Sequence, residues 1–187
     1  MTLFEYLIVV SSIILSMGMI RLVSGLPSAF TKGPFWVHFL WLIATLIGHA
    51  LYWWQLWSAH EFVEWNFARF LYILLGPLLL YSQAVTLVPA NPDEVSSWRE
   101  RFFQVFRAFF IARAFYLVHV AGMGAILRGV PLLSIPAAGQ LMFLSALLLS
   151  VAGAATTNLR LQGAVVILSV GMMLVGIFSF AFEPLGV

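Results

Sequence analysis

Cysteine is absent from this 187-residue chain, and charged residues make up only 9% of it. Without cysteine, the chain can form no disulfide, no thiolate metal site and no cysteine nucleophile. Paired carboxylates, zinc-binding motifs and activated nucleophiles are also missing, so the sequence disfavours a membrane enzyme. The formal net charge of +2 rests on few basic residues, which are better explained as topology signals than as a nucleic-acid surface. We therefore expect no nucleic-acid partner.

Long apolar stretches fill most of the chain instead. Hydrophobic residues account for 63% of the sequence, and the mean hydropathy is +1.03. A helix needs about 20 mostly apolar residues to cross a bilayer. A β-barrel would show short alternating strands, whereas the run from Leu71 to Leu80 does not alternate. The sequence predicts one all-α domain over residues 1–187, a polytopic bundle of six helices that span residues 3–23, 35–57, 67–88, 104–127, 137–157 and 161–182.

The distribution of basic residues predicts the orientation of this bundle, because loops rich in Lys and Arg stay in the cytoplasm. No Lys or Arg precedes the first span and no small-residue cleavage site follows it, so we expect it to remain as a membrane helix. Both termini are then predicted to lie outside, in the periplasm. The basic residues beside the first, third and fifth loops are Arg21, Lys32, Arg99, Arg101, Arg107 and Arg160.

The loop before the fourth span predicts a short interfacial helix over residues 92–103. Asn91 is a suitable N-cap, Pro92 suits the first helical position, and Glu94 is the expected capping partner. We interpret the apolar stripe that follows as a lipid-facing anchor or, alternatively, as a docking surface for another protein. The stripe consists of Val95, Trp98, Phe102, Phe106 and Phe109.

Arg113 is the strongest candidate for a functional residue inside the membrane. At about 1.5 Å per residue it lies about 13 Å below the cytoplasmic start of the fourth span, near the midplane. A charge at that depth is costly and marks a functional site by default. The alternative is that its long side chain reaches toward the headgroups or bonds helix carbonyls.

His49 and His119 form a second signal, because both lie about 21 to 22 Å from the same face on the second and fourth spans. Two imidazoles at one level are suited to ligate a b-type heme or to relay protons. They are equally compatible with two separately hydrogen-bonded histidines. His38 lies at the start of the second span, where we expect it to meet water.

Weaker polar patterns suggest a partly polar interior. Glu5, Ser12 and Ser16 share one face of the first span, and Tyr72, Gly76 and Gln83 share one face of the third. Pro77 removes a backbone hydrogen bond and is expected to kink the third span. The fifth span has a small-residue face suited to close helix contact, made of Ala146, Ser150, Gly153, Ala154 and Thr157.

The first half of the chain contains three distinctive patterns: Phe4-Glu5-Tyr6-Leu7, Ser12-Ile13-Ile14-Leu15, and an aromatic second span with His38, Trp41 and Trp53-Trp54. In these patterns it resembles a group of small, uncharacterised bacterial multi-pass membrane proteins. The similarity covers roughly the first 90 residues. The resemblance implies a location in the bacterial inner membrane and draws attention to Glu5, but it implies no activity.

Three functions follow from these patterns. The first is a small channel or transporter for a small anion or for protons, which would use Arg113, His49, His119, Glu5, Ser12, Ser16, Tyr72 and Gln83. The second is a non-catalytic subunit or assembly factor of a larger membrane complex. The third is an electron-transfer protein with heme b on His49 and His119. The expected partners are the lipid bilayer and either further copies of this chain or other membrane subunits.

Overall fold

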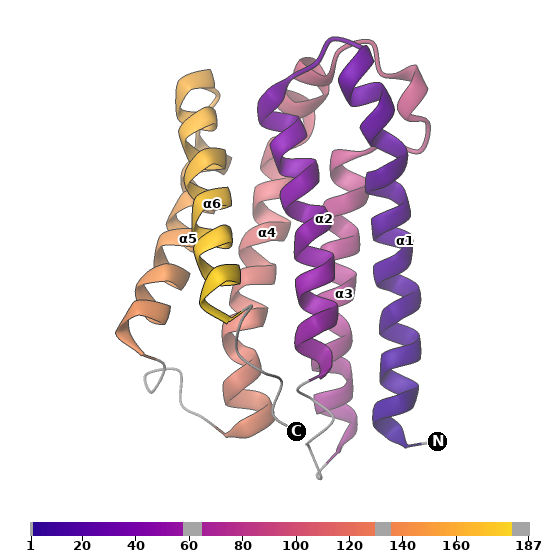
Figure 1. The fold of residues 1–187 in the computed structure, drawn as a ribbon, viewed down its shortest axis with the longest axis vertical. Coiled ribbons are helices and arrows are strands. Elements are labelled where there is room, and N and C mark those ends of the chain that lie inside the picture. The colour runs from indigo at the N-terminus through magenta and orange to yellow at the C-terminus, as the bar shows by residue number, and fades with distance from the viewer. Residues whose placement is uncertain (1, 58–64, 130–135, 181–187) are drawn as a thin grey trace.

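The computed structural model describes residues 2–57, 65–129 and 136–180, and within them helices are the only regular secondary structure (Figure 1). Each of its six long helices is sufficiently long and apolar to cross a membrane, which confirms the predicted fold class. The helices are α1 (Leu3–Thr31), α2 (Trp36–Trp57), α3 (Phe67–Leu87), α4 (Trp98–Arg128), α5 (Ala137–Ala155) and α6 (Leu159–Phe180), with a 3-10 turn η2 (Pro92–Glu94) between α3 and α4.

Helices α1 to α4 form an antiparallel bundle, and α5 and α6 form a hairpin at its side (Figure 1). Helix α3 contacts α1, α2 and α4, whereas the hairpin packs through α5 on α4 and through α6 on α2. The small-residue face of α5 makes the close contact expected of it, because a methyl group at Gly153 would lie 2.3 Å from the Phe110 ring of α4. The hairpin and the bundle thus enclose a shared interior.

Two helices are longer than the apolar runs that predicted them. Helix α1 has 29 residues and α4 has 31, so they measure about 44 Å and 46 Å and exceed a hydrocarbon core of about 30 Å. Helix α1 continues through Pro27 because its last turns pack on α3, where a methyl group at Gly25 would lie 2.8 Å from Val88. Tertiary packing therefore extends α1 beyond its predicted end.

The segment expected to be an interfacial helix over residues 92–103 is divided into two elements. Pro92–Glu94 forms the 3-10 turn, and the side chain of Asn91 donates to Glu94 at 2.8 Å without capping the backbone. Helix α4 begins instead at Trp98, where the Ser97 hydroxyl accepts from the backbone N–H of Glu100 at 3.3 Å. Because the helix begins after Ser97, its first turns continue without a break into the fourth span.

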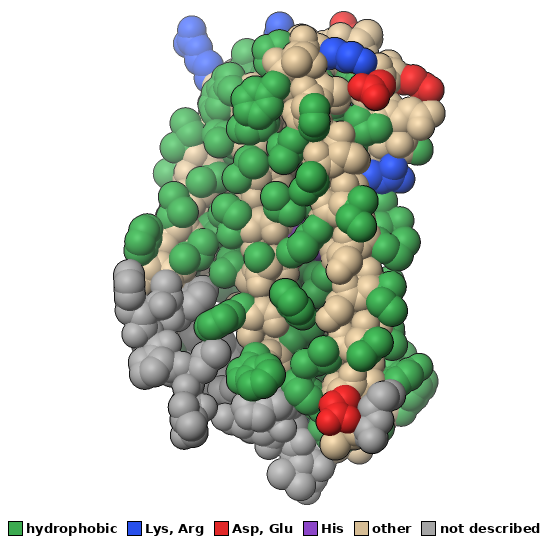
Figure 2. Space-filling model, turned by 45° about the vertical axis from the view of Figure 1, so that its right-hand side comes forward, with side chains coloured by type: hydrophobic (Ala, Val, Ile, Leu, Met, Phe, Trp, Pro, Cys, Tyr) green, Lys and Arg blue, Asp and Glu red, His purple; other side chains and the backbone are tan. Residues whose placement is uncertain are grey.

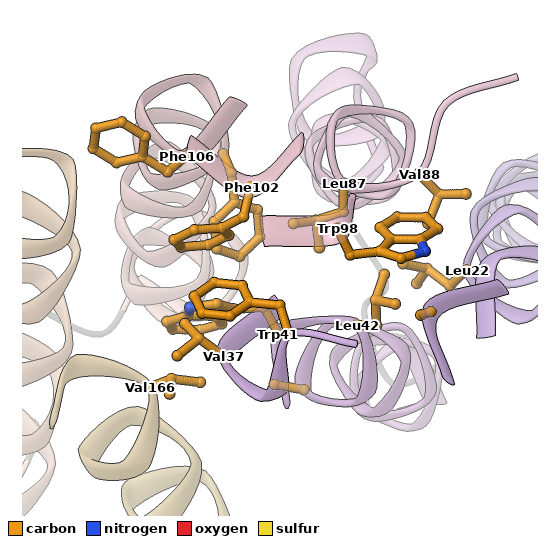
Figure 3. Close-up of a cluster of buried hydrophobic side chains, with 14 of the residues drawn as sticks. Leu22, Val37, Trp41, Leu42, Leu87, Val88, Trp98, Phe102, Phe106 and Val166 are labelled. Carbon is orange, nitrogen blue, oxygen red and sulfur yellow. The ribbon is translucent and has the colours of Figure 1, made fainter. Parts of the chain in front are cut away.

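The aromatic stripe of this segment faces the protein interior, not lipid or a docking partner. Trp98, Phe102, Phe106 and Phe109 are at most 4% exposed, and Figure 3 shows Trp98 near Leu22, Leu87 and Val88 of the neighbouring segments. The reason is that α4 enters the bundle at its first turn, beside α2 and α3. The expectation that His38 meets water is also wrong, since its fully buried ring lies 4.8 Å from that of Trp98.

Basic side chains hold the loop between α3 and α4 against the bundle. Arg21 donates to the carbonyls of Pro89 and Ala90 at 3.2 Å each, and Arg101 donates to the carbonyl of Thr86 at 2.9 Å. Lys32 pairs with Asp93 at 3.4 Å on the surface. Lys and Arg side chains on the face in Figure 2 gather toward this end of the molecule, which we call the charged end.

Candidate functional site

A cavity of about 230 Å³ lies between α2, α3, α4, α5 and α6, within the span of the bundle. A water molecule occupies about 30 Å³ in the liquid, so this volume suits a small ligand or several waters. Asp, Glu and His are absent from its described lining. The polar residues that line it are Thr45, Gln55, Gln83, Arg113, Tyr116 and Ser169.

Arg113 brings a positive charge to this cavity. Its guanidinium carbon lies 4.7 Å from the centre of the Trp41 ring, so the side chain leans toward the charged end and stops on the indole. Its Nε is buried and has no hydrogen-bond partner, and no ion pair to Arg113 is found among the described residues. If Arg113 were satisfied by helix carbonyls, its Nε–H group would be expected to donate to one, and it does not. An unpartnered charged donor at this depth favours an anion as its partner.

Two neutral hydroxyl groups beside Arg113 are also unpartnered. Thr45 and Ser169 are 3% and 4% exposed, and neither hydroxyl has a hydrogen-bond partner in the described part of the chain. Ser and Thr inside helices commonly donate to the carbonyl four residues earlier. Ser150 does so here at 2.9 Å and Thr86 at 2.6 Å. Thr45 and Ser169 depart from that habit, and both residues line the cavity with hydroxyl oxygens that are buried and unpartnered.

Gln83 completes the group of donors. Its side chain is 2% exposed, and its amide nitrogen donates to the carbonyl of Leu79 at 3.3 Å, which engages one of its two N–H bonds. The guanidinium, the two hydroxyls and this amide come from four different helices, α4, α2, α6 and α3. Such a set of donors without a carboxylate suits the binding of an anion.

A second polar cluster, formed by Tyr52, Tyr72 and His119, lies outside the cavity lining. The Tyr52 hydroxyl donates to the carbonyl of Ile73 at 2.6 Å, and that carbonyl is the one that Pro77 cannot bond because proline lacks an N–H. Tyr52 has a single proton to give, so its oxygen accepts from Nε2–H of His119 at 3.2 Å. Tyr72 donates to the backbone carbonyl of His119 at 2.6 Å.

His49 has different neighbours from His119. Its Nδ1 donates to the carbonyl of Thr45 at 2.8 Å, and a methyl group at Gly18 would lie 2.2 Å from its Nε2. The two histidines thus match the description of separately hydrogen-bonded groups. Heme ligation could keep the His49 bond to Thr45, but Nε2 of His49 packs against Gly18 and Nε2 of His119 is bonded to Tyr52, and heme binding by this pair stays a prediction. In the described part of the chain, no three His, Cys, Asp or Glu residues are placed to hold a metal ion.

The polar face predicted on α1 does not contribute to the cavity. Glu5 is exposed at the start of α1, where it forms a capping box with Thr2 through contacts of 2.8 Å and 3.2 Å. Ser16 is exposed and Ser12 is partly buried, whereas the neighbouring Ser11 is fully buried with an unpartnered hydroxyl. A rotation of about 100° per residue separates adjacent positions on a helix, which is why Ser11 and Ser12 differ in burial.

Gly18→Ala is expected to lower the free energy of unfolding by about 1–2 kcal/mol, since overpacking of this kind costs about 1–3 kcal/mol. The added methyl group meets the His49 ring, which the bond to Thr45 holds in place. Thermal unfolding in detergent measures the effect. Gly171→Ala is the matched control, because nothing lies within 4 Å of a methyl group there. Equal midpoints for the two variants would contradict the packing of His49 on α1.

Comparison with protein-family models, with curated proteins and with solved structures finds no match for this chain.

Proposed function

We propose that this protein is a small membrane channel or transporter that carries a small anion through the Arg113 cavity. One observation supports this most strongly: a guanidinium group lies inside the span of the bundle, beside two unpartnered hydroxyls and without a paired carboxylate among the described residues. A charged group inside an apolar bundle without a counterion destabilises the protein unless a ligand or water satisfies it. A passing anion supplies the missing charge and accepts the available hydrogen bonds.

An anion is favoured over protons by the chemistry of the lining. Protons move most readily through His, Asp and Glu, and the described lining of the cavity has none of these residues. His49 and His119 are engaged with Thr45 and Tyr52 instead. The cavity thus offers donors to a negative group rather than a chain of titratable groups.

The proposed orientation places the charged end in the cytoplasm of a bacterium, because basic loops remain on that side of the inner membrane. Helix α1 begins and α6 ends at the opposite end (Figure 1), which would then face the periplasm. Arg113 leans toward the charged end, where its guanidinium group lies on the buried Trp41 ring.

Anion flux into proteoliposomes tests this function. We expect the purified protein to carry at least one of chloride, nitrate and acetate faster than liposomes without protein do. Arg113→Gln should reduce that flux at least about tenfold, because a hydrogen bond to a charged group is worth about 1.5–3 kcal/mol.

Arg107→Gln is the matched control for this experiment. Arg107 lies on the same helix and also sits over an aromatic ring, Phe106, at 5.6 Å, but it is exposed and outside the cavity. Its substitution should leave the flux within a factor of about two, as expected for a surface charge. Equal flux for wild type and Arg113→Gln, or no flux of any of the three anions, would refute the proposal.

A further inference from the structure

The Arg113 cavity has a polar end and an apolar end. Helices α2, α4 and α6 run away from the charged end, so residues with higher numbers on them lie farther from it, and α5 runs the other way. Thr45, Arg113 and Ser169 therefore line the part nearer the charged end. Beyond them, the lining is mainly apolar and includes Leu51, Leu117, Met142, Met172 and Gly176, with Tyr116 and Gln55 as polar exceptions.

The guanidinium group is held in a defined position at the polar end. Trp41 is fully buried, and its ring contacts those of Phe109 and Phe110 at centroid distances of 5.1 Å and 5.4 Å. Arg113 lines the cavity, and its guanidinium group contacts the Trp41 ring while its buried Nε has no partner among the described residues. The planar fork of N–H groups in arginine matches a carboxylate, which can accept two parallel hydrogen bonds.

The apolar end favours an anion that carries a hydrocarbon chain. A halide or nitrate would contact only the polar end, whereas an aliphatic chain would also contact the methionines. Methionine side chains are unbranched and adaptable, so they pack well against chains of different length. A methyl group at Gly176 would lie 2.9 Å from the terminal methyl of Met142, which shows how closely this glycine approaches the methionine.

From this arrangement we infer that the cavity binds a short-chain aliphatic monocarboxylate, with its carboxylate on Arg113, Thr45 and Ser169 and its chain between Leu51, Met142 and Met172. The inference rests on the proposed function, because it names the class of anion that the same cavity carries. No covalent step is involved, and the carboxylate stays ionised when it is bound.

Binding in detergent is the most direct test, since the neutral forms of short carboxylic acids cross bilayers unaided. Sodium acetate, propionate, butyrate, chloride and nitrate are titrated at constant ionic strength, and the dissociation constants are measured by calorimetry. Each added methylene should tighten binding about fourfold from acetate to butyrate, as burial of an apolar methylene predicts. Chloride and nitrate should bind more weakly than butyrate.

Three variants and one neutral ligand test whether butyrate binds in the Arg113 cavity through its carboxylate. Arg113→Lys keeps the charge but loses the fork, and should weaken butyrate binding at least about tenfold, even if Arg113→Gln fails to fold. Met142→Ala should shift the preferred chain length beyond butyrate, whereas Arg107→Gln should change nothing. Butanol, which has the chain without the carboxylate, should not compete.

The possible failures are distinguishable. Chloride or nitrate binding as tightly as butyrate, affinity that does not rise with chain length, or competition by butanol would overturn the monocarboxylate inference. Arg113-dependent flux of an inorganic anion in proteoliposomes would then still support the proposed function. Absence of both binding and flux for every anion would overturn the two together.

Discussion

Gly76→Ala is expected to lower the free energy of unfolding of the detergent-solubilised protein by about 3 kcal/mol. A methyl group at this position would lie 2.2 Å from Cζ and Oη of Tyr52 and 2.4 Å from its Cε2. The Tyr52 ring is fully buried and rigid, so it has no open space into which to turn. Overpacking alone accounts for about 1–3 kcal/mol of the loss.

The remainder of the loss comes from the hydrogen bonds that Tyr52 makes. If the ring were displaced, the Tyr52 hydroxyl would no longer donate to the carbonyl of Ile73, which has no helical partner because Pro77 lacks an N–H. It would also no longer accept from His119. An unsatisfied buried carbonyl costs about 1–3 kcal/mol by itself.

Thermal unfolding followed by circular dichroism measures this loss, with Gly124→Ala as the control. Gly124 is also helical, and nothing lies within 4 Å of a methyl group at that position. Its substitution should be neutral or stabilising, because alanine favours helix by about 1 kcal/mol over glycine. Tyr52→Phe and Gly76→Ala should be less than additive, since both disturb the same hydroxyl. A Gly76→Ala midpoint that equals the control would show that Tyr52 does not pack on α3 as described.

The membrane helices could be located from the sequence because length and hydropathy decide whether a segment crosses a bilayer. The same information also located Arg113 and Gln83, since a buried charge and a buried amide stand out in apolar runs. It also placed His49 and His119 inside the membrane, where both are buried beside their own hydrogen-bond partners.

The rotation of each helix about its axis could not be predicted in the same way. Lipid and protein core are both apolar, so a membrane helix shows little contrast between its two faces. Trp41 is fully buried whereas Trp53 and Trp54 on the same helix are 56% and 54% exposed, although all three are equally hydrophobic. The aromatic stripe of α4 was assigned to lipid for the same reason.

Thr45 and Ser169 were not selected from the sequence because single hydroxyl residues are common in membrane helices, where they usually bond their own backbone. Their role in the cavity depends on the absence of that bond, which only the structure shows. One sequence signal was present for Thr45: it lies four residues after Trp41 and four before His49, on one face of the second span.

Trp41→Ala is expected to be the most destabilising truncation on α2, with a loss of about 3 kcal/mol in the free energy of unfolding. This value is at the low end for buried tryptophans, because lipid is as apolar as the core and the cost is mainly lost packing. The lost contacts include those of the Trp41 ring with Phe109, Phe110 and Arg113. Unfolding in mixed micelles, followed by circular dichroism, measures the loss, and Trp53→Ala is the control on the same helix. A loss no larger than that of the control would contradict the burial of Trp41.

A double-mutant cycle separates the packing role of Trp41 from its effect on Arg113. Trp41→Leu and Arg113→Gln, alone and together, should reveal a coupling free energy of about 1–2 kcal/mol, as expected for a desolvated cation–π pair. Trp41→Phe retains a ring beneath the guanidinium and should preserve part of that coupling. If the indole also positions Arg113 for the anion, Trp41→Leu will weaken anion binding even in samples that remain folded. Independent effects of the two substitutions would mean that Trp41 only fills space, and that the position of Arg113 is set by the other residues around the cavity.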